Sequence, residues 1–252
     1  MNFLEISLFF IVPAFAAAVN SVAGGGTFLT FPVFIMNGLT PLQANVMSTI
    51  ALWPGAVASS YGYRKMLVAD IRKLLPLLVI GVIGGAAGSL TLLNTPETFF
   101  EQLIPWLLLF ATLIFTFGRY GIVFLHRHFP NANGYYNLGL ALQLLIAFYG
   151  GYFGAGIGIL LLAVLQMLGL SNIHEMNALK TLLATFINLA TVIIYIIEGQ
   201  IIWHLAFIMI AGGILGGYVG TKLALKVPPK YIRWFVSGVG FVMTIYFFLH
   251  NV

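Results

Sequence analysis

The sequence contains no cysteine, a single aspartate and few charged residues of either sign. Asp, Glu, Lys and Arg together account for 7% of its 252 residues, whereas they make up about 25% of an ordinary soluble domain. The absence of cysteine excludes thiolate metal sites, disulfide bonds and cysteine nucleophiles. The shortage of charge excludes a fold that presents most of its surface to water.

Hydrophobic residues make up 61% of the chain and occur in long runs. A helix of about 20 residues crosses the ~30 Å hydrocarbon layer of a bilayer. The sequence lacks the apolar–polar alternation of a transmembrane barrel, so helices must satisfy the backbone in lipid. We therefore predict an all-α, multi-pass protein that contacts membrane lipid. The expected apolar segments are at about 4–38, 44–63, 74–93, 99–120, 136–170, 176–197, 201–222 and 231–250.

The two halves of the chain resemble each other at a nearly constant spacing. Asn45 aligns with Asn177, and the Gly-Gly-x-x-Gly-Ser run at 84–89 aligns with the Gly-Gly-x-x-Gly-Thr run at 216–221. The first and fifth segments are also alike, because each is longer than one span requires and each is interrupted by glycines. The predicted division is a first repeat at 1–125, a connector at 126–135 and a second repeat at 136–252.

The first segment resembles a signal peptide only in part. Small residues at 14–18 match a cleavage site, but no Lys or Arg precedes the apolar stretch, as a signal peptide would require. Because the segment also has a counterpart in the second half, we expect it to belong to the mature fold.

The basic residues predict the orientation in the membrane, because cytoplasmic loops collect Lys and Arg. If the three basic regions share one side, each repeat makes a net three crossings. Each long segment is then a re-entrant hairpin that breaks at its glycines, the second repeat is inverted, and both termini are non-cytoplasmic. This orientation also explains the net charge of +5 without nucleic-acid binding. The three regions contain Arg64, Lys65, Arg72 and Lys73; Arg119 and Arg127; and Lys222, Lys226, Lys230 and Arg233.

The broken hairpins are the first candidates for a binding site. Inverted repeats with glycine-interrupted segments are typical of transporters whose substrate site lies near the bilayer midplane. Unpaired N–H groups at the start of a half-helix attract anions, although glycines also serve close helix packing. We favour packing for Gly84, Gly88, Gly216 and Gly220. We favour an anion site for Gly24, Gly25, Gly26, Thr27, Gly154, Gly156 and Gly158.

Polar residues near the hairpins are further candidates. Asn20 precedes the first glycine cluster by one helical turn. Its amide can donate to an oxyanion or form a hydrogen bond to a neighbouring helix. Thr49 and Thr181 fall near the start of the segments that follow the hairpins and can line the same cavity. For the neighbouring pair Asn45 and Asn177 we favour helix capping.

Lys180 is the one basic residue outside the three basic regions. A charge at that depth in an apolar segment is costly, so a functional role is the default hypothesis. The alternatives are a lysine that extends to the interface or one that pairs with Glu175. Its counterpart in the first repeat is Ser48, so a contact through this charge would break the symmetry.

The sequence contains no pattern typical of an enzyme or of a resident metal. The histidines form no metal-ligand pattern with carboxylates, and no HExxH, GxSxG or GxxxxGK[ST] motif is present. We expect no catalytic residue, no metal and no cofactor.

Two runs resemble the sulfite exporter TauE/SafE family, also described as the 4-toluene sulfonate uptake permeases. The first is Asn-Ser-Val-Ala-Gly-Gly-Gly-Thr at 20–27, followed by Phe31-Pro32-Val33 and by Gly-Leu-Thr-Pro-x-x-Ala at 38–44. The second is Gly-Gly-Tyr-Phe-Gly-Ala-Gly-Ile-Gly at 150–158, followed by Asn188-Leu189 and Gly199-Gln200-Ile201. The resemblance covers nearly the whole chain.

This resemblance implies a carrier in a prokaryotic cytoplasmic (inner) membrane, with sulfite, a sulfonate or a related organosulfur or carboxylate anion as the substrate. It also implies a site serine, for which Ser48 is the nearest match, while Thr27 replaces the family's usual fourth glycine. We expect transport by alternating access around the two hairpins. A passive anion channel of the same fold and a non-transporting membrane subunit are the alternatives. Substrate identity, direction, coupling and oligomeric state (monomer or homodimer) stay open.

Overall fold

The computed structural model describes residues 3–67, 71–128, 136–170, 172–224 and 229–250. Throughout these ranges the ordered elements are helices, as predicted, and no strand occurs in them. In each half a helix is followed by a glycine joint, a short helix and three longer helices. The first half contains α1 (Phe3–Ala23), α2 (Thr27–Met36), α3 (Pro41–Tyr63), the 3-10 turn η1 (Arg64–Met66), α4 (Ile71–Leu93) and α5 (Glu97–His128). The second half contains α6 (Tyr136–Tyr152), α7 (Ile157–Met167), α8 (Ile173–Ile197), α9 (Trp203–Ala224) and α10 (Pro229–His250).

Among the described residues, six helices are long and apolar enough to cross a bilayer: α1, α4, α5, α8, α9 and α10. The predicted span at 44–63 is not one of these, although α3 is 23 residues long. α3 is long enough but not apolar enough, because it lies inside the bundle. Most of its residues are buried against other helices, so polar residues are tolerated on it. The helix α5 also continues to His128, beyond the end predicted for the segment 99–120.

Polar residues fix the start of α3 and of α8. Thr40 accepts a hydrogen bond from the backbone N–H of Gln43, whose side chain accepts one from the backbone N–H of Thr40, which is a capping box. The side chain of Asn172 caps α8 in the same way by accepting from its first turn. The hypothesis that Asn45 and Asn177 are caps is therefore wrong, because both lie inside their helices.

Close helix packing repeats in the two halves. A methyl group on Gly216 of α9 would overlap the Ala14 carbonyl of α1, and one on Gly84 of α4 would lie 2.8 Å from the Leu144 carbonyl of α6. Thus α1 packs against α9 as its counterpart α6 packs against α4. Small residues allow this backbone approach in a membrane. The packing role expected for these glycines is confirmed.

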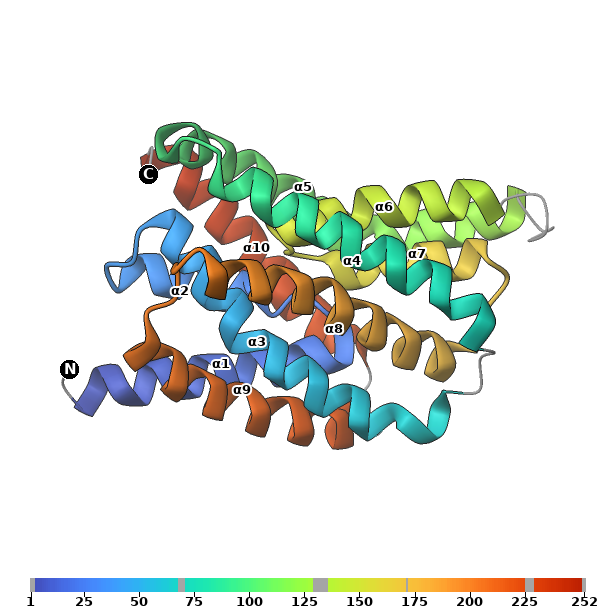
Figure 1. Ribbon diagram of the computed structural model, residues 1–252, viewed down its shortest axis with the longest axis horizontal. Helices are drawn as coiled ribbons and strands as arrows, with labels where there is room; N and C mark the ends of the chain where they lie inside the picture. The colour runs from blue at the N-terminus through green and yellow to red at the C-terminus, as the bar shows by residue number, and fades with distance from the viewer. Residues whose placement is uncertain (1–2, 68–70, 129–135, 171, 225–228, 251–252) are drawn as a thin grey trace.

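The two chain ends lie at the same end of the molecule (Figure 1). α1 runs inward from that end, and α2 turns back towards it (Figure 1). The turn η1, which contains Arg64 and Lys65, and the last turn of α9, which contains Lys222, lie towards the opposite end. The basic residues Arg64, Lys65 and Lys222 therefore lie towards one end of the bundle.

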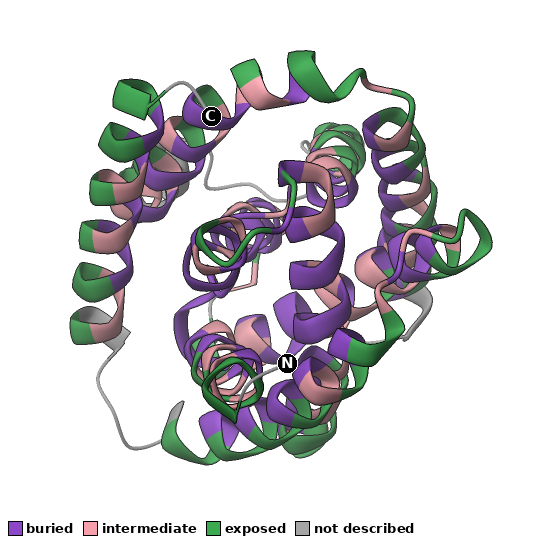
Figure 2. Ribbon diagram, turned by 90° about the vertical axis from the view of Figure 1, so that its left-hand side faces the viewer, coloured by how far each residue is buried: buried purple, intermediate pink, exposed green. Residues whose placement is uncertain are grey.

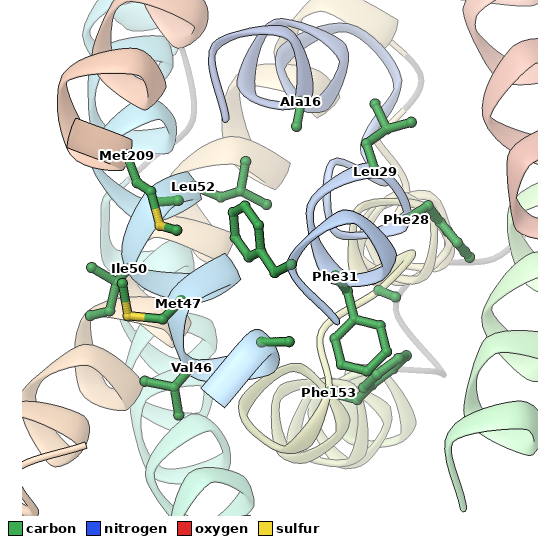
Figure 3. Packing of buried hydrophobic residues seen from close by; sticks show 14 of the residues in the cluster. Ala16, Phe28, Leu29, Phe31, Val46, Met47, Ile50, Leu52, Phe153 and Met209 are labelled. Atoms are coloured by element: carbon green, nitrogen blue, oxygen red, sulfur yellow. The ribbon is translucent and has the colours of Figure 1, made fainter. Parts of the chain in front are cut away.

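Buried residues lie on the inward faces of the helices and exposed residues on their outward faces (Figure 2). Aromatic residues of the hairpins dominate this core: Phe31 of α2 meets Phe153 at a centroid distance of 5.3 Å, edge to face. Figure 3 shows both rings between Val46 and Met47 of α3 on one side and Phe28 on the other. The joints of both hairpins are thus held inside the protein and not at its surface.

Candidate functional site

A cavity lies where the two glycine joints meet in the middle of the bundle. A methyl group on Gly24 would lie 3.5 Å from the Cα atom of Gly158, so the two joints nearly touch. The cavity offers about 40 Å³ to the centres of water-sized molecules, whereas one buried water needs ~10–15 Å³. It therefore has room for about three waters, or for one compact polyatomic ion.

The lining comes from the hairpins and from the helices that follow them. Within the described residues, α1, α2, α3, α6, α7 and α8 and the two joints contribute residues to the lining, and α4, α5, α9 and α10 contribute none. The sequence-predicted residues that line the cavity are Asn20, Gly24, Thr27, Thr49, Gly154, Gly158, Lys180 and Thr181.

Glycine is required at the joints because the backbone there is left-handed. Gly24 and Gly25 have φ angles of 80° and 83°, and Gly154 and Gly156 have 77° and 75°. Side chains with a Cβ atom rarely adopt such angles. The glycines therefore end the first helix of each hairpin and let the chain start a new one.

The short helices α2 and α7 begin at the cavity. Thr27 is the first residue of α2, Gly158 is the second of α7, and both line it. The first N–H groups of a helix have no partner within the helix and carry partial positive charge. Several of these groups donate to carbonyls of the joints, as Phe28 does to Gly25 and Ile157 does to Gly154. The two helix N-termini still direct partial positive charge at the same small volume, which suits an anion.

Four of the sequence-predicted residues lie outside the lining. A methyl group on Gly25 would lie 2.7 Å from the ring of Phe115, and one on Gly156 would lie 3.3 Å from the Ala111 carbonyl. Both glycines thus allow α5 to pack closely against the two joints. The N–H of Gly26 donates to Asn20 Oδ1 at 3.4 Å. The fourth, Ser48, is buried in α3.

The Gly26 contact also decides what Asn20 offers to a ligand. Because Asn20 Oδ1 accepts from the joint, the two N–H groups of the amide remain available to a ligand. The side chain lines the cavity as a donor, which again suits an oxyanion.

The side chain of Lys180 enters the cavity and is 3% exposed. Its Nζ has no hydrogen-bond partner within the described residues, and its Cδ atom lies against Gly158. Both alternatives considered for this lysine fail: it does not extend to the surface, and Nζ makes no hydrogen bond to Glu175. The positive charge of Arg233, on α10, repels the positive charge of Lys180, although Arg233 is not one of the residues that line the cavity. Burial without a partner is costly for an ammonium group, and an anion in the cavity would supply that partner.

Three polar residues of the lining were missed from the sequence: Ser21, Ser59 and Asn188. Asn188 belongs to the Asn188-Leu189 pair that is part of the family resemblance, and that pair was the signal available for it. Ser21 follows Asn20 directly. For Ser59 no sequence signal existed, because its place depends on how α3 packs against α1.

A cluster of hydroxyl groups joins α1, α3 and α9 beside the cavity. Ser21 Oγ and Ser59 Oγ are 2.5 Å apart, Ser59 Oγ donates to the Gly217 carbonyl at 3.0 Å, and Tyr63 OH donates to the Ser21 carbonyl at 3.2 Å. The cluster fixes the end of α1, one turn before its glycine joint.

The counterpart cluster in the second half joins α6, α8 and α4. Thr191 Oγ1 donates to the Gly85 carbonyl at 3.4 Å, and Tyr195 OH donates to the Gly151 carbonyl at 3.5 Å. Since Gly151 has no side chain, this cluster lacks the hydroxyl pair and its bonds are longer.

Within the described residues, no group of three His, Asp or Glu side chains is placed to hold a metal ion. The cavity itself contains no carboxylate and no imidazole. The arrangement offers hydrogen-bond donors and one positive charge.

Comparison with known proteins agrees with this geometry. The family model of the sulfite exporter TauE/SafE matches residues 9–247. The chain belongs to this family. Both glycine joints, the cavity and Lys180 fall inside the matched region of this TauE/SafE protein. No solved structure matches it.

Curated relatives are similar over almost the whole chain. A probable membrane transporter protein of Haemophilus influenzae is 29% identical over 241 residues, covering 95% of this chain and 92% of the relative. The probable membrane transporter protein YfcA of Escherichia coli is 26% identical over 245 residues, covering 96% and 88%. A probable membrane transporter protein of Sinorhizobium, ORF9, is 25% identical over 239 residues, covering 92% and 88%. Together with the apolar helices, these matches identify this TauE/SafE protein as a multi-pass integral membrane protein of a transporter family.

Proposed function

We propose that this protein is a secondary transporter of a small oxyanion, namely sulfite, a sulfonate or a related organosulfur or carboxylate anion. The observation that carries the proposal is the buried Lys180 ammonium, whose Nζ has no hydrogen-bond partner in the described structure and which faces a cavity of ionic size. A bound oxyanion would pair with that charge and accept hydrogen bonds from Asn20 and from the backbone N–H groups of Thr27 and Gly158, which line the cavity at the starts of α2 and α7.

Alternating access is the mechanism that the packing supports. The cavity lies between two joints that each end a long helix and start a short one. Each hairpin packs against helices of the other half, α1 on α9 and α6 on α4. Two rigid units of opposite orientation can therefore rock about α3 and α8, where Trp53 Nε1 donates to the carbonyl of its neighbour Thr185 at 3.0 Å.

The proposed placement in the membrane follows from the same geometry. The chain ends share one end of the bundle, and Arg64, Lys65 and Lys222 lie towards the other. With the basic end in the cytoplasm, both termini are non-cytoplasmic and the second repeat is inverted. The proposed location is a prokaryotic inner membrane.

Reconstitution into liposomes with labelled sulfite, a sulfonate and a carboxylate tests the proposal. We expect uptake of at least one of these anions, and accumulation against its own gradient when a pH or ion gradient is imposed. Flux that only dissipates the anion's own gradient would favour a passive channel of the same fold. Absence of flux for every anion tested would contradict both.

A further inference from the structure

We infer that the first repeat holds a binding site for a monovalent alkali cation, formed by Asn45, Ser48 and the end of α6. Asn45 and Ser48 lie three residues apart on α3, so they share one face of the helix. Each side chain is 1% exposed. Asn45 Oδ1 and Ser48 Oγ have no hydrogen-bond partner within the described residues.

The orientation of the Asn45 amide is fixed by chemistry. Asn45 Nδ2 donates to the Tyr152 carbonyl at 3.0 Å, and a carbonyl can only accept. The remaining atom, Oδ1, can itself only accept, so it requires a donor or a cation. An unpaired oxygen is costly inside a membrane protein, where bulk water is absent.

The end of α6 adds negative potential at the same place. Tyr152 is the last residue of α6, and the last carbonyl groups of a helix carry partial negative charge that attracts cations. Half-helix ends and unwound carbonyl groups coordinate cations in other inverted-repeat transporters. No Asp or Glu occurs in α2, α3, α6 or α7, so the site offers neutral oxygens. Such a ligand set suits a monovalent ion, since divalent ions take carboxylates.

The repeat supports a positive charge at this position. Asn45 corresponds to Asn177, Thr49 to Thr181 and Ser48 to Lys180. The second half thus places an ammonium group where the first half places a small hydroxyl with no partner in the described structure. A free cation beside Ser48 would be the counterpart of the tethered cation of Lys180.

The inferred site adjoins the anion cavity. Thr49 follows Ser48, lines the cavity, and donates to the Asn45 carbonyl at 3.1 Å. Phe153 follows Tyr152 and lines it too. A cation bound here would hold α3 against the second joint, and so favour the closed shape of the cavity. The further role that we assign to it, coupling to anion transport, depends on the proposed function.

Thermal unfolding of the purified protein in NaCl, KCl and choline chloride of equal concentration tests the binding site without any transport. We expect a higher Tm in Na⁺ or K⁺ than in choline. Ser48→Ala should weaken the apparent cation affinity by roughly tenfold or more, as the loss of one charge-assisted contact does. Ser60→Ala is the matched control on α3: its hydroxyl is paired with that of Thr185 at 3.1 Å, and Ser60 is not among the residues that line the cavity, so the variant should keep the cation-dependent shift. Ser48→Lys should remove the shift by supplying a tethered charge.

Equal Tm values in all three salts would overturn the inference and leave a structural water as the partner of both oxygens. An undiminished shift in Ser48→Ala would place the cation elsewhere and overturn it as well. Anion flux in liposomes separates the two proposals. A cation-dependent Tm without flux would contradict the proposed function alone, whereas flux that is independent of Na⁺ and K⁺ would contradict the coupling.

Discussion

Replacement of Lys180 by methionine should weaken anion binding without destabilising the fold. Methionine keeps an unbranched chain of similar length but removes the ammonium group, which is 3% exposed and whose Nζ has no hydrogen-bond partner within the described structure. A hydrogen bond to a charged group contributes about 1.5–3 kcal/mol. Its loss corresponds to an increase of about 10- to 150-fold in the apparent KM for the anion.

The Lys180→Met substitution should not lower the stability of the protein. Removing a buried charge that lacks a partner is neutral or stabilising, so Tm in detergent should be unchanged or higher. A lysine that merely supported the fold would give a lower Tm.

Initial rates of uptake into liposomes, measured over a range of anion concentrations, check this prediction. Lys222→Met is the matched control, because Lys222 is exposed at the end of α9, where Nζ lies 4.4 Å from the centre of the Tyr218 ring. It should transport like the parent protein. A Lys180→Met protein with an apparent KM within about twofold of the parent, or with a lowered Tm, would refute the reasoning.

Three further predictions rest on packing and orientation. Gly25→Leu should abolish flux while membrane insertion persists, because a side chain there meets the ring of Phe115. Retained flux would show that transport does not require this joint. Gly217→Ala should lower the free energy of unfolding by about 1–3 kcal/mol, because the methyl group overlaps the Gly55 carbonyl. Gly238→Ala, whose added methyl group would have nothing within 4 Å, should leave Tm unchanged or raise it in a thermal unfolding experiment, because alanine is the better helix former. A cysteine at Lys222 should react with an impermeant thiol reagent only from the cytoplasmic side, and labelling from outside would contradict the proposed topology.

Local rules made the helices and their interruptions predictable from the sequence. Long apolar runs require helices in lipid, and Gly24 and Gly25 in the first joint and Gly154 and Gly156 in the second carry the left-handed angles that end α1 and α6. The starts of α3 and α8 were less predictable, since Asn45 and the actual cap Thr40 are both plausible caps by residue type. Only the observed hydrogen bonds distinguish them.

Long-range packing limited what could be predicted of the site. The burial of Lys180 depends on how α8 lies against α7, and the pairing of Ser21 with Ser59 depends on how α1 meets α3. Neither appears in any local pattern. The role of α3 was missed for the same reason: its polar residues are tolerated because other helices surround it, which hydropathy alone does not reveal.

The central claim is that the cavity between the two glycine joints binds the anion and opens to each side of the membrane in turn. Asn188 lines that cavity, and the chain contains no cysteine, so Asn188→Cys gives a single reporter. An impermeant thiol reagent should label this cysteine from either side of the membrane, and a transported sulfonate or carboxylate should slow the labelling. Labelling from one side only, or a rate that no anion changes, would contradict the claim.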